Sequence, residues 1–404
     1  MVFGVILSVL VGLMHWYVWK RLIKDTTGPG VVRRAGTVAI IVLALLVFAT
    51  LTLSRVLSPD VAGWFSWPGY IWFGLIVYLF MTLLVLELPR LALRGWLRRK
   101  PLEATATTDA APPAPAAEPA PKKPEINQSR RLFLARGAGL VAGAASISLV
   151  GAGIGNALGP PDLLRVPVRL RKLDPSLAGF RIAVVSDIHL GPLLGRSHTE
   201  RIVRMINETE PDLVAVVGDL ADGTVDELGD DAAPLRDLVS REGSFFVTGN
   251  HEYFIEPDAW VREMDRLGVH PLRNEGLTLT RGGASIELAG VTDLSGESIG
   301  DGPDFDRALE GRDVDNNPVV LLAHQPVQVE DAAARGVDLQ LSGHTHGGQM
   351  YPFHHFVTLA QPAVSGLARV DGTQLYVTRG AGFWGPPVRV GAPPDISVLE
   401  LHPE

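Results

Sequence analysis

The fold is decided by one stretch, RIAVVSDIH at residues 181–189. An apolar run of strand length leads here directly into Asp187 and His189. Four more apolar runs end in the same kind of polar cluster: LVAVV before Gly218-Asp219-Leu220-Ala221-Asp222-Gly223, SFFVT before Gly249-Asn250-His251-Glu252, VVLLA before His324, and DLQLS before Gly343-His344-Thr345-His346. Continuous apolar strands are typical of sheets covered on both faces, and the carboxyl ends of such strands form the edge where ligands bind. The sequence therefore predicts an α/β domain with one polar site at this edge.

The elements around these strands follow from hydrophobic periodicity. We expect strands at Arg181–Ser186, Leu213–Val217, Ser244–Thr248, Ser285–Ala289, Val319–Leu322, Asp338–Leu341, Leu375–Thr378 and Ile396–Leu401. Amphipathic stretches of helical length lie between several of them, at Ser197–Asn207, Pro234–Arg241, Pro257–Leu267 and Val327–Arg335. We expect the acidic run Asp222–Asp231 to be a solvated loop, apart from Asp222 itself.

The residue types and spacing of the clusters favour a metal site. In Asp187-x-His189 and His344-x-His346, side chains two apart on an extended chain point the same way and can hold one ion together. Five of the eleven histidines fall in the strand-end clusters, and the chain has no cysteine, so any metal is held by nitrogen and oxygen. Carboxylate, amide and imidazole ligands suit Mn²⁺, Fe or Zn²⁺.

The ordered series D-x-H, G-D-x-x-D-G, G-N-H-E, H and G-H-T-H resembles the calcineurin-like metallophosphoesterase superfamily. A later stretch, TRGAGFWGPPVR at residues 378–389 with GAPPDI at 391–396, resembles a bacterial branch of membrane-anchored or twin-arginine-exported phosphoesterases. The resemblance implies a four-layer α/β/β/α sandwich of two mixed sheets that holds two divalent metal ions and hydrolyses a phosphate monoester or diester.

The resemblance also implies a role for each residue. One metal would be held by Asp187, His189, Asp219 and His346, and the other by Asp219, Asn250, His324 and His344, with Asp219 bridging the two. His251 matches a histidine that binds no metal and acts on the leaving oxygen or the phosphoryl charge. Asp222 matches a residue that pairs with that histidine in some branches. Glu252 stands where an aspartate is common, which leaves the orientation of His251 open.

The first hundred residues differ sharply in charge from the rest. They hold 11 Lys/Arg against three acidic residues, so residues 101–404 carry a net charge of −16 within the total of −8. So acidic a domain disfavours nucleic acid as a partner. Apolar runs at about Val2–Trp19, Ala35–Ser54 and Tyr70–Leu88 are long enough to cross a bilayer as helices. We therefore expect an all-α transmembrane module in residues 1–100.

Two segments join this module to the α/β domain of residues 160–404. Residues 101–128 are rich in Pro and Ala and read as an extended linker. Residues 129–159 begin with Ser129-Arg130-Arg131 and continue into a fourth apolar run, compatible with either a twin-arginine-like signal or an ordinary spanning helix. In both cases the positive-inside rule predicts a multi-pass cell-membrane protein whose α/β domain lies outside the cytoplasm.

The leading function is hydrolysis of a phosphate ester at the membrane surface, with a lipid or cell-envelope component among the candidate substrates. One alternative is a non-catalytic, metal-stabilised module that binds a cell-surface component on the same fold. Another is a transporter, which the scarcity of ionisable residues within the apolar runs disfavours: His15 and Glu87 lie there, both near an end.

Some residues near the motifs stay open in role. Arg379 and Arg389 could bind phosphate oxygens or form ion pairs. Phe383 and Trp384 could form a wall of the substrate site, contact lipid or pack locally. For His354, His355, His198 and His270 we favour structural or surface positions.

Overall fold

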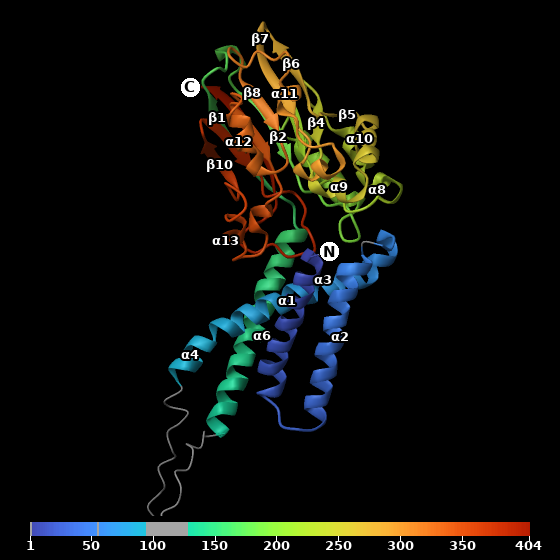
Figure 1. Ribbon diagram of the computed structural model, residues 1–404, viewed down its shortest axis with the longest axis vertical. Coiled ribbons are helices and arrows are strands. Elements are labelled where there is room, and N and C mark those ends of the chain that lie inside the picture. The colour runs from blue at the N-terminus through green and yellow to red at the C-terminus, as the bar shows by residue number, and fades with distance from the viewer. Residues whose placement is uncertain (1, 55, 94–127) are drawn as a thin grey trace, which may run out of the picture. The chain divides into compact units, whose positions relative to one another are not determined.

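The structure is a computed structural model that describes residues 2–54, 56–93 and 128–404 (Figure 1). The chain divides into two compact units: Met1–Phe48 with Trp72–Leu149, and Ala49–Ile71 with Val150–Glu404. The boundaries expected from the sequence at residues 100, 128 and 159 stay predictions. Of the expected linker, residues 101–127 lie outside the described residues.

The apolar runs of the N-terminal part form long helices. These are α1 (Val2–Val18) with a π-helical extension at Trp19–Lys24, α2 (Val31–Leu53), α3 (Pro59–Val85), the short α4 (Glu87–Ala92) and α6 (Gln128–Leu158). Helix α3 begins at Pro59, well before the expected Tyr70, because proline is tolerated at the first helical position. Four described segments are long and apolar enough to cross a membrane: Ile6–Lys24, Val31–Leu53, Pro59–Ala92 and Ser129–Leu158.

The two ionisable residues of the expected spans both have partners within the first unit. The ring of His15 bonds the carbonyl of Val11 at 2.8 Å and accepts the indole N–H of Trp72 at 3.0 Å. Glu87 pairs with Arg21 at 2.8 Å. Both side chains therefore have polar partners within the first unit. These contacts give no support to an ion pathway through the helices.

The second unit contains two six-stranded mixed sheets. The first sheet has the order β1-β12-β2-β3-β4-β5, with β1 (Asp162–Leu170), β12 (Asp395–Pro403), β2 (Phe180–Val185), β3 (Leu213–Val217), β4 (Ser244–Val247) and β5 (Val269–Pro271). The second has the order β10-β11-β9-β8-β7-β6, with β10 (Gly366–Val370), β11 (Thr373–Val377), β9 (Leu339–Ser342), β8 (Val319–Leu322), β7 (Ala284–Gly290) and β6 (Glu275–Arg281). Strands β2, β3 and β4 run parallel to one another, as do β7, β8 and β9.

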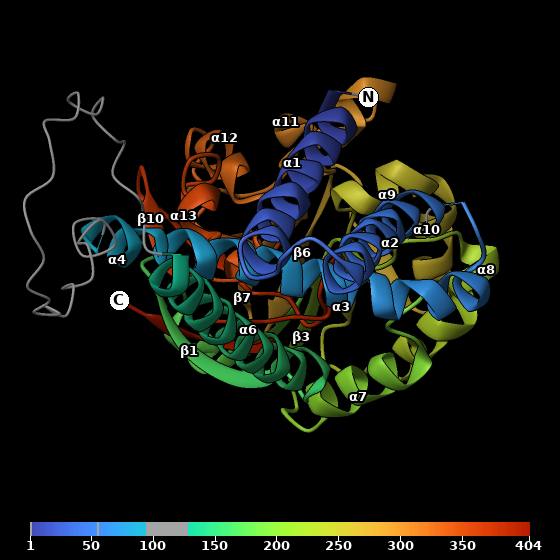
Figure 2. The ribbon, with the colours of Figure 1, turned by 90° about the horizontal axis from the view of Figure 1, so that it is seen from below.

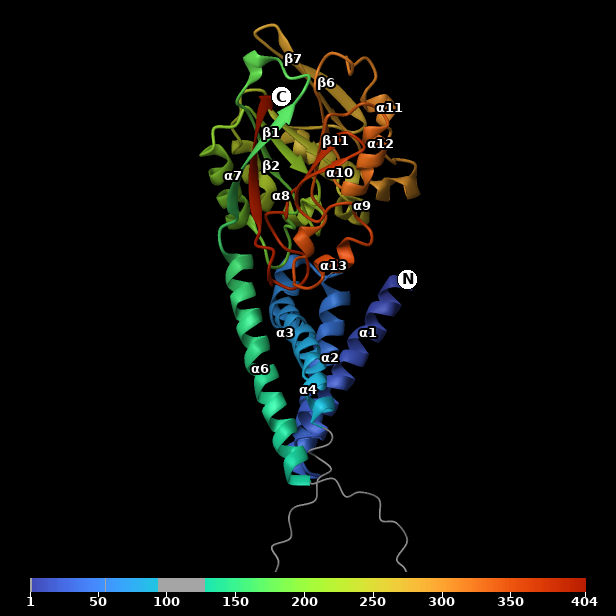
Figure 3. The ribbon, with the colours of Figure 1, turned by 90° about the vertical axis from the view of Figure 1, so that its left-hand side faces the viewer.

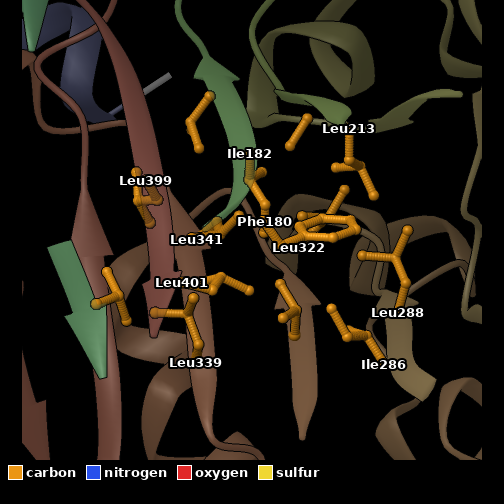
Figure 4. Packing of buried hydrophobic residues seen from close by; sticks show 14 of the residues in the cluster. Phe180, Ile182, Leu213, Ile286, Leu288, Leu322, Leu339, Leu341, Leu399 and Leu401 are labelled. Carbon is orange, nitrogen blue, oxygen red and sulfur yellow. The ribbon is translucent and has the colours of Figure 1, made fainter. Parts of the chain in front are cut away.

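The two sheets pack face to face through one apolar core. Alternate residues of β2 such as Ile182 and Val184 meet Leu288, Leu322 and Leu341 of the second sheet (Figure 4). The residues between them on β2, Ala183 and Val185, point the other way into a second core. This alternation is the period of an extended strand, and it explains why a strand with two buried faces reads as a continuous apolar run.

Helices cover both outer faces. On the first sheet they are α7 (Arg196–Asn207), α8 (Val225–Ala232) and α10 (Pro257–Arg266), which bury Ile202, Leu228 and Trp260 against it. On the second sheet, α11 (Phe305–Ala308) and α12 (Val329–Ala333) bury Phe305 and Ala332, on the opposite side of the sandwich (Figure 2). The predicted α/β/β/α architecture with an N-terminal helical module is confirmed.

Several local predictions were wrong. The acidic run after Asp222 is no loop: residues 225–232 form α8, whose N-cap residue Thr224 makes a capping box with Glu227. The expected helix Pro234–Arg241 is a 3-10 turn at Ala233–Asp237. Strands β1, β5, β6 and β10 were missed, and all four lie at sheet edges. β5 has three residues, and β1, β6 and β10 expose alternate residues, which weakens their apolar signal.

Candidate metal centre

The strand-end clusters meet at one edge of the sandwich. Strands β2, β3 and β4 of the first sheet lead into Asp187, Asp219 and Asn250, while β8 and β9 of the second lead into His324 and His344. Both sheets therefore contribute to a single site. The structure brings together all seven metal ligands expected from the resemblance, together with His251 and Asp222.

The first ligand group contains Asp187, His189 and His346, all buried. The Nε2 atoms of the two histidines lie 3.0 Å apart. Nε2 of His346 is 3.3 Å from Oδ1 of Asp187, and Nε2 of His189 is 4.0 Å from the same oxygen. Three potential donor atoms thus converge on one point, as they would around one cation.

The second ligand group contains Asp219, His324 and His344. Nε2 of His324 is 3.3 Å from Oδ2 of Asp219, and Nδ1 of His344 is 2.9 Å from Oδ1 of Asn250. The same Asp219 oxygen lies 3.8 Å from Nε2 of His189 in the first group. Asp219 is therefore the residue that faces both groups.

The donor set fits divalent cations on an observation independent of family. Nε2 of His324 is fully buried and makes no hydrogen bond to any described residue. An orphaned imidazole nitrogen in a dry pocket is costly unless something binds it. Its own Nδ1 lies 2.8 Å from the carbonyl of Val217, so Nδ1 keeps its proton and Nε2 is the nitrogen that a cation would bind. That is the tautomer that a metal-binding histidine requires.

The backbone at the site is held in an uncommon conformation. Asp187, His189, Asp219, His344 and His346 all have positive φ, between 51° and 69°. Aspartate and histidine tolerate this region better than most residues, but strain of this kind clusters at functional sites. Gly343 lies between strand β9 and His344, and a Cβ there would come within 1.9 Å of Ser186 Oγ and 2.4 Å of Asp187 Oδ2. Only glycine lets the two sheets approach this closely.

Asp222 joins the metal ligands to His251. Its Oδ1 lies 3.0 Å from Nδ1 of His189 and 2.5 Å from Nδ1 of His251. Nε2 of His251 is left facing the site, 3.9 Å from Oδ2 of Asp219. The pairing that orients His251 therefore comes from Asp222, and the aspartate that is often found at position 252 is not needed for it.

Glu252 has a different task, which the sequence did not reveal. It is buried and accepts the backbone N–H of Gly249 at 2.6 Å, of Leu220 at 2.8 Å and of Asp219 at 3.1 Å. These contacts tie the loop after β3 to the start of helix α9 (Asn250–Ile255). Its position three residues after Gly249 at a helix start was the available signal, because a glutamate there commonly caps a helix.

Arg389 is buried and does not face the site as a phosphate contact would. It donates to the carbonyls of Gly382, Arg379 and His346, and its Nη2 lies 3.0 Å from Nδ1 of His346. It supports a ligand of the first group from behind. Arg379 pairs with Asp395 at 2.7 Å and Asp162 at 3.4 Å, so it serves a structural ion pair.

The remaining candidate residues from the sequence differ in burial and in contact with the site. Phe383 is buried against Ala157 and Leu194, whereas Trp384 is exposed and its ring meets that of His251 edge-on at 5.8 Å. His198 is buried in α7 and His270 is exposed. His354 and His355 lie in the short helix α13 (His354–Val357), half-buried and exposed respectively.

Burial and mutual attraction set the charges of the site. Burial raises the pKa of Asp219, but attraction to His324, His251 and His189 outweighs it and holds the pKa well below the ordinary value. Burial alone lowers the pKa of His251, yet Asp222 and Asp219 raise it to about 9. Burial, reinforced by the Arg389 charge, holds the pKa of His346 well below its usual range. Burial lowers the pKa of His324, but attraction to Asp219 outweighs it and raises that pKa well above its ordinary value. Without a metal the site thus favours an ionised Asp219, protonated forms of His251 and His324, and a neutral His346.

Comparison with known proteins agrees with this geometry. The model of the calcineurin-like phosphoesterase family matches residues 180–348, which include every predicted metal ligand. An uncharacterized metallophosphoesterase of Helicobacter pylori strain J99 is 40% identical over 255 residues, which cover 62% of this chain and 67% of that protein. The chain belongs to the calcineurin-like phosphoesterase family. Another relative, the uncharacterized metallophosphoesterase YkuE of Bacillus subtilis, is 30% identical over 283 residues covering 68% of this chain and 97% of that protein.

A relative whose name describes a transmembrane protein also matches this chain. The transmembrane protein with metallophosphoesterase domain of Bos taurus is 40% identical over 263 residues, which cover 62% of this chain and 59% of that protein. This chain therefore matches little more than half the length of that relative. Together with the four candidate spans, the similarity supports a membrane protein. The relatives come from bacteria and animals alike, so the bacterial exported branch is not established by them.

Proposed function

We propose that the chain is a dinuclear metal-dependent phosphoesterase that hydrolyses a phosphate monoester or diester. The observation that carries the proposal is the position of Asp219, whose Oδ2 lies 3.8 Å from a nitrogen of the first group and 3.3 Å from one of the second. Asp187, His189 and His346 would complete one cation site, and Asn250, His324 and His344 the other. The cations would be Mn²⁺, Fe or Zn²⁺, which suit mixed carboxylate, amide and imidazole ligands.

The chemistry that two such cations supply is polarisation of the phosphate ester and activation of a water as nucleophile. The chain's own contribution lies in the pair His251 and Asp222. Asp222 accepts Nδ1–H of His251 and stabilises its protonated form, so that Nε2–H faces the site. From there His251 donates a proton to the leaving oxygen and balances charge that develops on the phosphoryl group.

The experiment uses the full chain, purified in detergent and stripped with chelator. Reloading with Mn²⁺, Fe²⁺ or Zn²⁺ should restore hydrolysis of p-nitrophenyl phosphate or bis(p-nitrophenyl) phosphate, with two metal equivalents bound. A reloaded protein that binds metal yet cleaves neither ester would favour the alternative of a metal-stabilised binding module. The Asp222-held His251 argues for catalysis, because a binding module has no need of an oriented proton donor.

We also propose a multi-pass topology with the phosphoesterase domain outside the cytoplasm. Positive residues follow the first span, and Arg130 and Arg131 lie in the first turns of α6, the fourth candidate span. The twin-arginine-like reading of this doublet and an ordinary spanning helix predict the same topology. A C-terminal reporter enzyme that is active only outside the cytoplasm should be active, and activity of a cytoplasm-specific reporter would contradict the topology.

A further inference from the structure

Large apolar side chains gather, exposed, beside the metal centre. We call these residues the aromatic rim: Phe254, Tyr351, Phe353, Phe356, Leu359 and Trp384. Phe356 is 61% exposed and Leu359 is 82% exposed. Single exposed apolar residues need no explanation, but a contiguous patch marks an interaction surface.

The rim is continuous with the catalytic site. The ring of His251 lies between those of Phe254 and Trp384, at 5.4 Å and 5.8 Å between ring centres. Trp384 is fixed in turn by Gln349, whose amide donates to the Trp384 carbonyl at 2.9 Å and accepts its N–H at 3.1 Å. The rest of the rim follows Gln349 in the chain. Phe254 and Trp384 therefore place one side of the rim next to the proton donor.

The rim is also tied to the end of a candidate membrane span. The N–H of Arg389 donates to the carbonyl of Gly153 in α6 at 2.9 Å, and Asn156 of the same helix donates to the carbonyl of Arg389 at 3.1 Å. The next residue, Val390, accepts the N–H of Tyr351 in the rim at 2.8 Å. These residues all belong to the second unit.

Helix α13, at the centre of the rim, accordingly lies at the same end of this unit as the C-terminal end of α6 (Figures 1 and 3). The candidate span ends at Leu158 and β1 begins at Asp162. Three connecting residues reach at most about 11 Å when fully extended. The surface of the bilayer that α6 leaves is thus close to the rim.

The charge of the rim suits a membrane surface. Residues 343–394, which include five of the six rim residues, contain one acidic residue, Asp371. This stands out in a domain whose net charge is strongly negative. A surface with few carboxylates is not repelled by anionic headgroups, and tryptophan and tyrosine favour the interfacial zone of a bilayer.

We propose that the aromatic rim lies against the surface of the membrane that α6 crosses, and that the substrate is a phosphate ester of a lipid in that membrane. The substrate class rests on the phosphoesterase function proposed above. The phosphate of a lipid headgroup sits at the level of the bilayer surface, and the rim brings the metal centre to that level. A lipid would present its phosphate to His251 while its acyl chains stay in the bilayer.

Docking is tested with a fluorescent label, which the absence of cysteine makes simple. Leu359→Cys places a single polarity-sensitive probe on the rim. Val239→Cys is the matched control, because Val239 is 67% exposed and its N–H bonds Asn207 at the far end of α7, at the edge opposite the site. In phosphatidylcholine nanodiscs, brominated lipid should quench the probe at 359 and not at 239. Equal quenching, or none at 359, would overturn the docking.

Substrate class is tested by comparing lipid and soluble esters in the same nanodiscs. Phe356→Glu and Leu359→Glu should lower hydrolysis of embedded phosphatidic acid or phosphatidylglycerol about tenfold, since a charge at the interface opposes docking by at least that much. Hydrolysis of bis(p-nitrophenyl) phosphate should stay within about twofold of wild type, and Val239→Glu should change neither.

The outcomes separate the two proposals. A wild type that cleaves the soluble ester but neither lipid, or rim variants that keep the full lipid rate, would overturn the lipid assignment alone. A metal-loaded wild type that cleaves no ester would overturn the phosphoesterase function, and with it the substrate class. The quenching at residue 359 would still decide whether the rim docks.

Discussion

The two ligand groups of the metal centre are supported from behind in opposite ways. In the second group, His324 donates from Nδ1 to the carbonyl of Val217, so its Nε2 is free to bind. In the first, Nδ1 of His346 faces the guanidinium of Arg389 at 3.0 Å. A guanidinium only donates, so Nδ1 must accept and the ring proton sits on Nε2. The carbonyl behind His324 is thus compatible with a cation at Nε2, whereas the positive guanidinium behind His346 opposes a cation in the first group.

This difference shows that the residue type of a ligand does not by itself determine how tightly it binds a metal. His324 and His346 are both buried, and both follow the expected motif. Their basicity depends on what lies behind them, because outer partners commonly change metal affinity 10- to 100-fold. We expect the first group to bind its metal more weakly than the second.

The largest effect should come from removing the residue that the two groups share. Asp219→Ala should lose both metals and lower hydrolysis by more than about 10³-fold, the loss that follows from removing a single electrostatic contact to the transition state. Metal analysis and ester hydrolysis on the full chain measure both. The exposed Asp237→Ala is the matched control and should behave as wild type. A variant that keeps one tightly bound metal would mean that Asp219 serves one group only.

His251→Ala should leave both ligand groups intact while removing the proton donor. We expect full metal content and a kcat lowered about 10²- to 10⁴-fold, the usual contribution of general acid catalysis. The exposed His270→Ala is the matched control. The kcat for a substrate with a better leaving group should fall less, because its leaving oxygen needs less protonation. Loss of metal in His251→Ala would show that this residue belongs to the ligand set after all.

Arg389→Met tests the comparison directly. It removes the charge behind His346 and leaves the carbonyls of Gly382, Arg379 and His346 without their donor. Because the charge that opposes a cation is gone, we expect the affinity of one metal equivalent to rise about 10- to 100-fold while the other stays near wild type. Stepwise metal titration monitored by isothermal titration calorimetry measures the two affinities. Arg379→Met, which breaks an ion pair with Asp395, is the control. A loss of affinity at the first group, or an equal change at both groups, would contradict the proposed asymmetry.

The sequence predicted which residues form the two groups but not the residues that support them, for a physical reason. The predicted ligands are Asp, His or Asn at strand ends, and both the residue types and their positions can be read from the sequence. A support only has to donate or accept, and a backbone carbonyl such as that of Val217 leaves no trace in the sequence. Arg389 lies 43 residues from His346, so nothing local to either residue predicts that they meet.

Some elements of the fold were likewise predicted from the sequence and others were not. Strands with two buried faces, such as Leu213–Val217 and Val319–Leu322, were predicted with their observed bounds because burial demands a continuous apolar run. The edge strands β1, β6 and β10 were missed because one face is solvated and mixed residues suffice there. The helix α8 was missed because its acidic residues face outward and two of its residues, Leu228 and Ala232, are buried.

The smallest effect should come from a histidine that shares the burial of the site but not its carboxylates. His198 is buried in α7, and its Nε2 has no hydrogen-bond partner among the described residues. Burial, with the nearby charge of Arg201, lowers its pKa to about 4, whereas Asp222 and Asp219 raise that of His251 to about 9. The contrast implies that carboxylate partners, and not burial, keep a histidine charged at the site.

This depressed pKa makes folding sensitive to acid. Above its ordinary pKa of about 6.5, His198 is neutral in both states and the stability is fully present. As the pH falls toward 4, the unfolded chain takes up a proton that the folded chain refuses, so stability is lost. At about pH 5.5 the loss should be about 1.4 kcal/mol, or tenfold in the folding equilibrium. Thermal unfolding between pH 7 and pH 5 checks this. As the pH falls, the Tm of wild type should decrease more than the Tm of His198→Gln. A pH-independent difference would mean that His198 has the same pKa in the folded and unfolded chain, and that burial does not lower it.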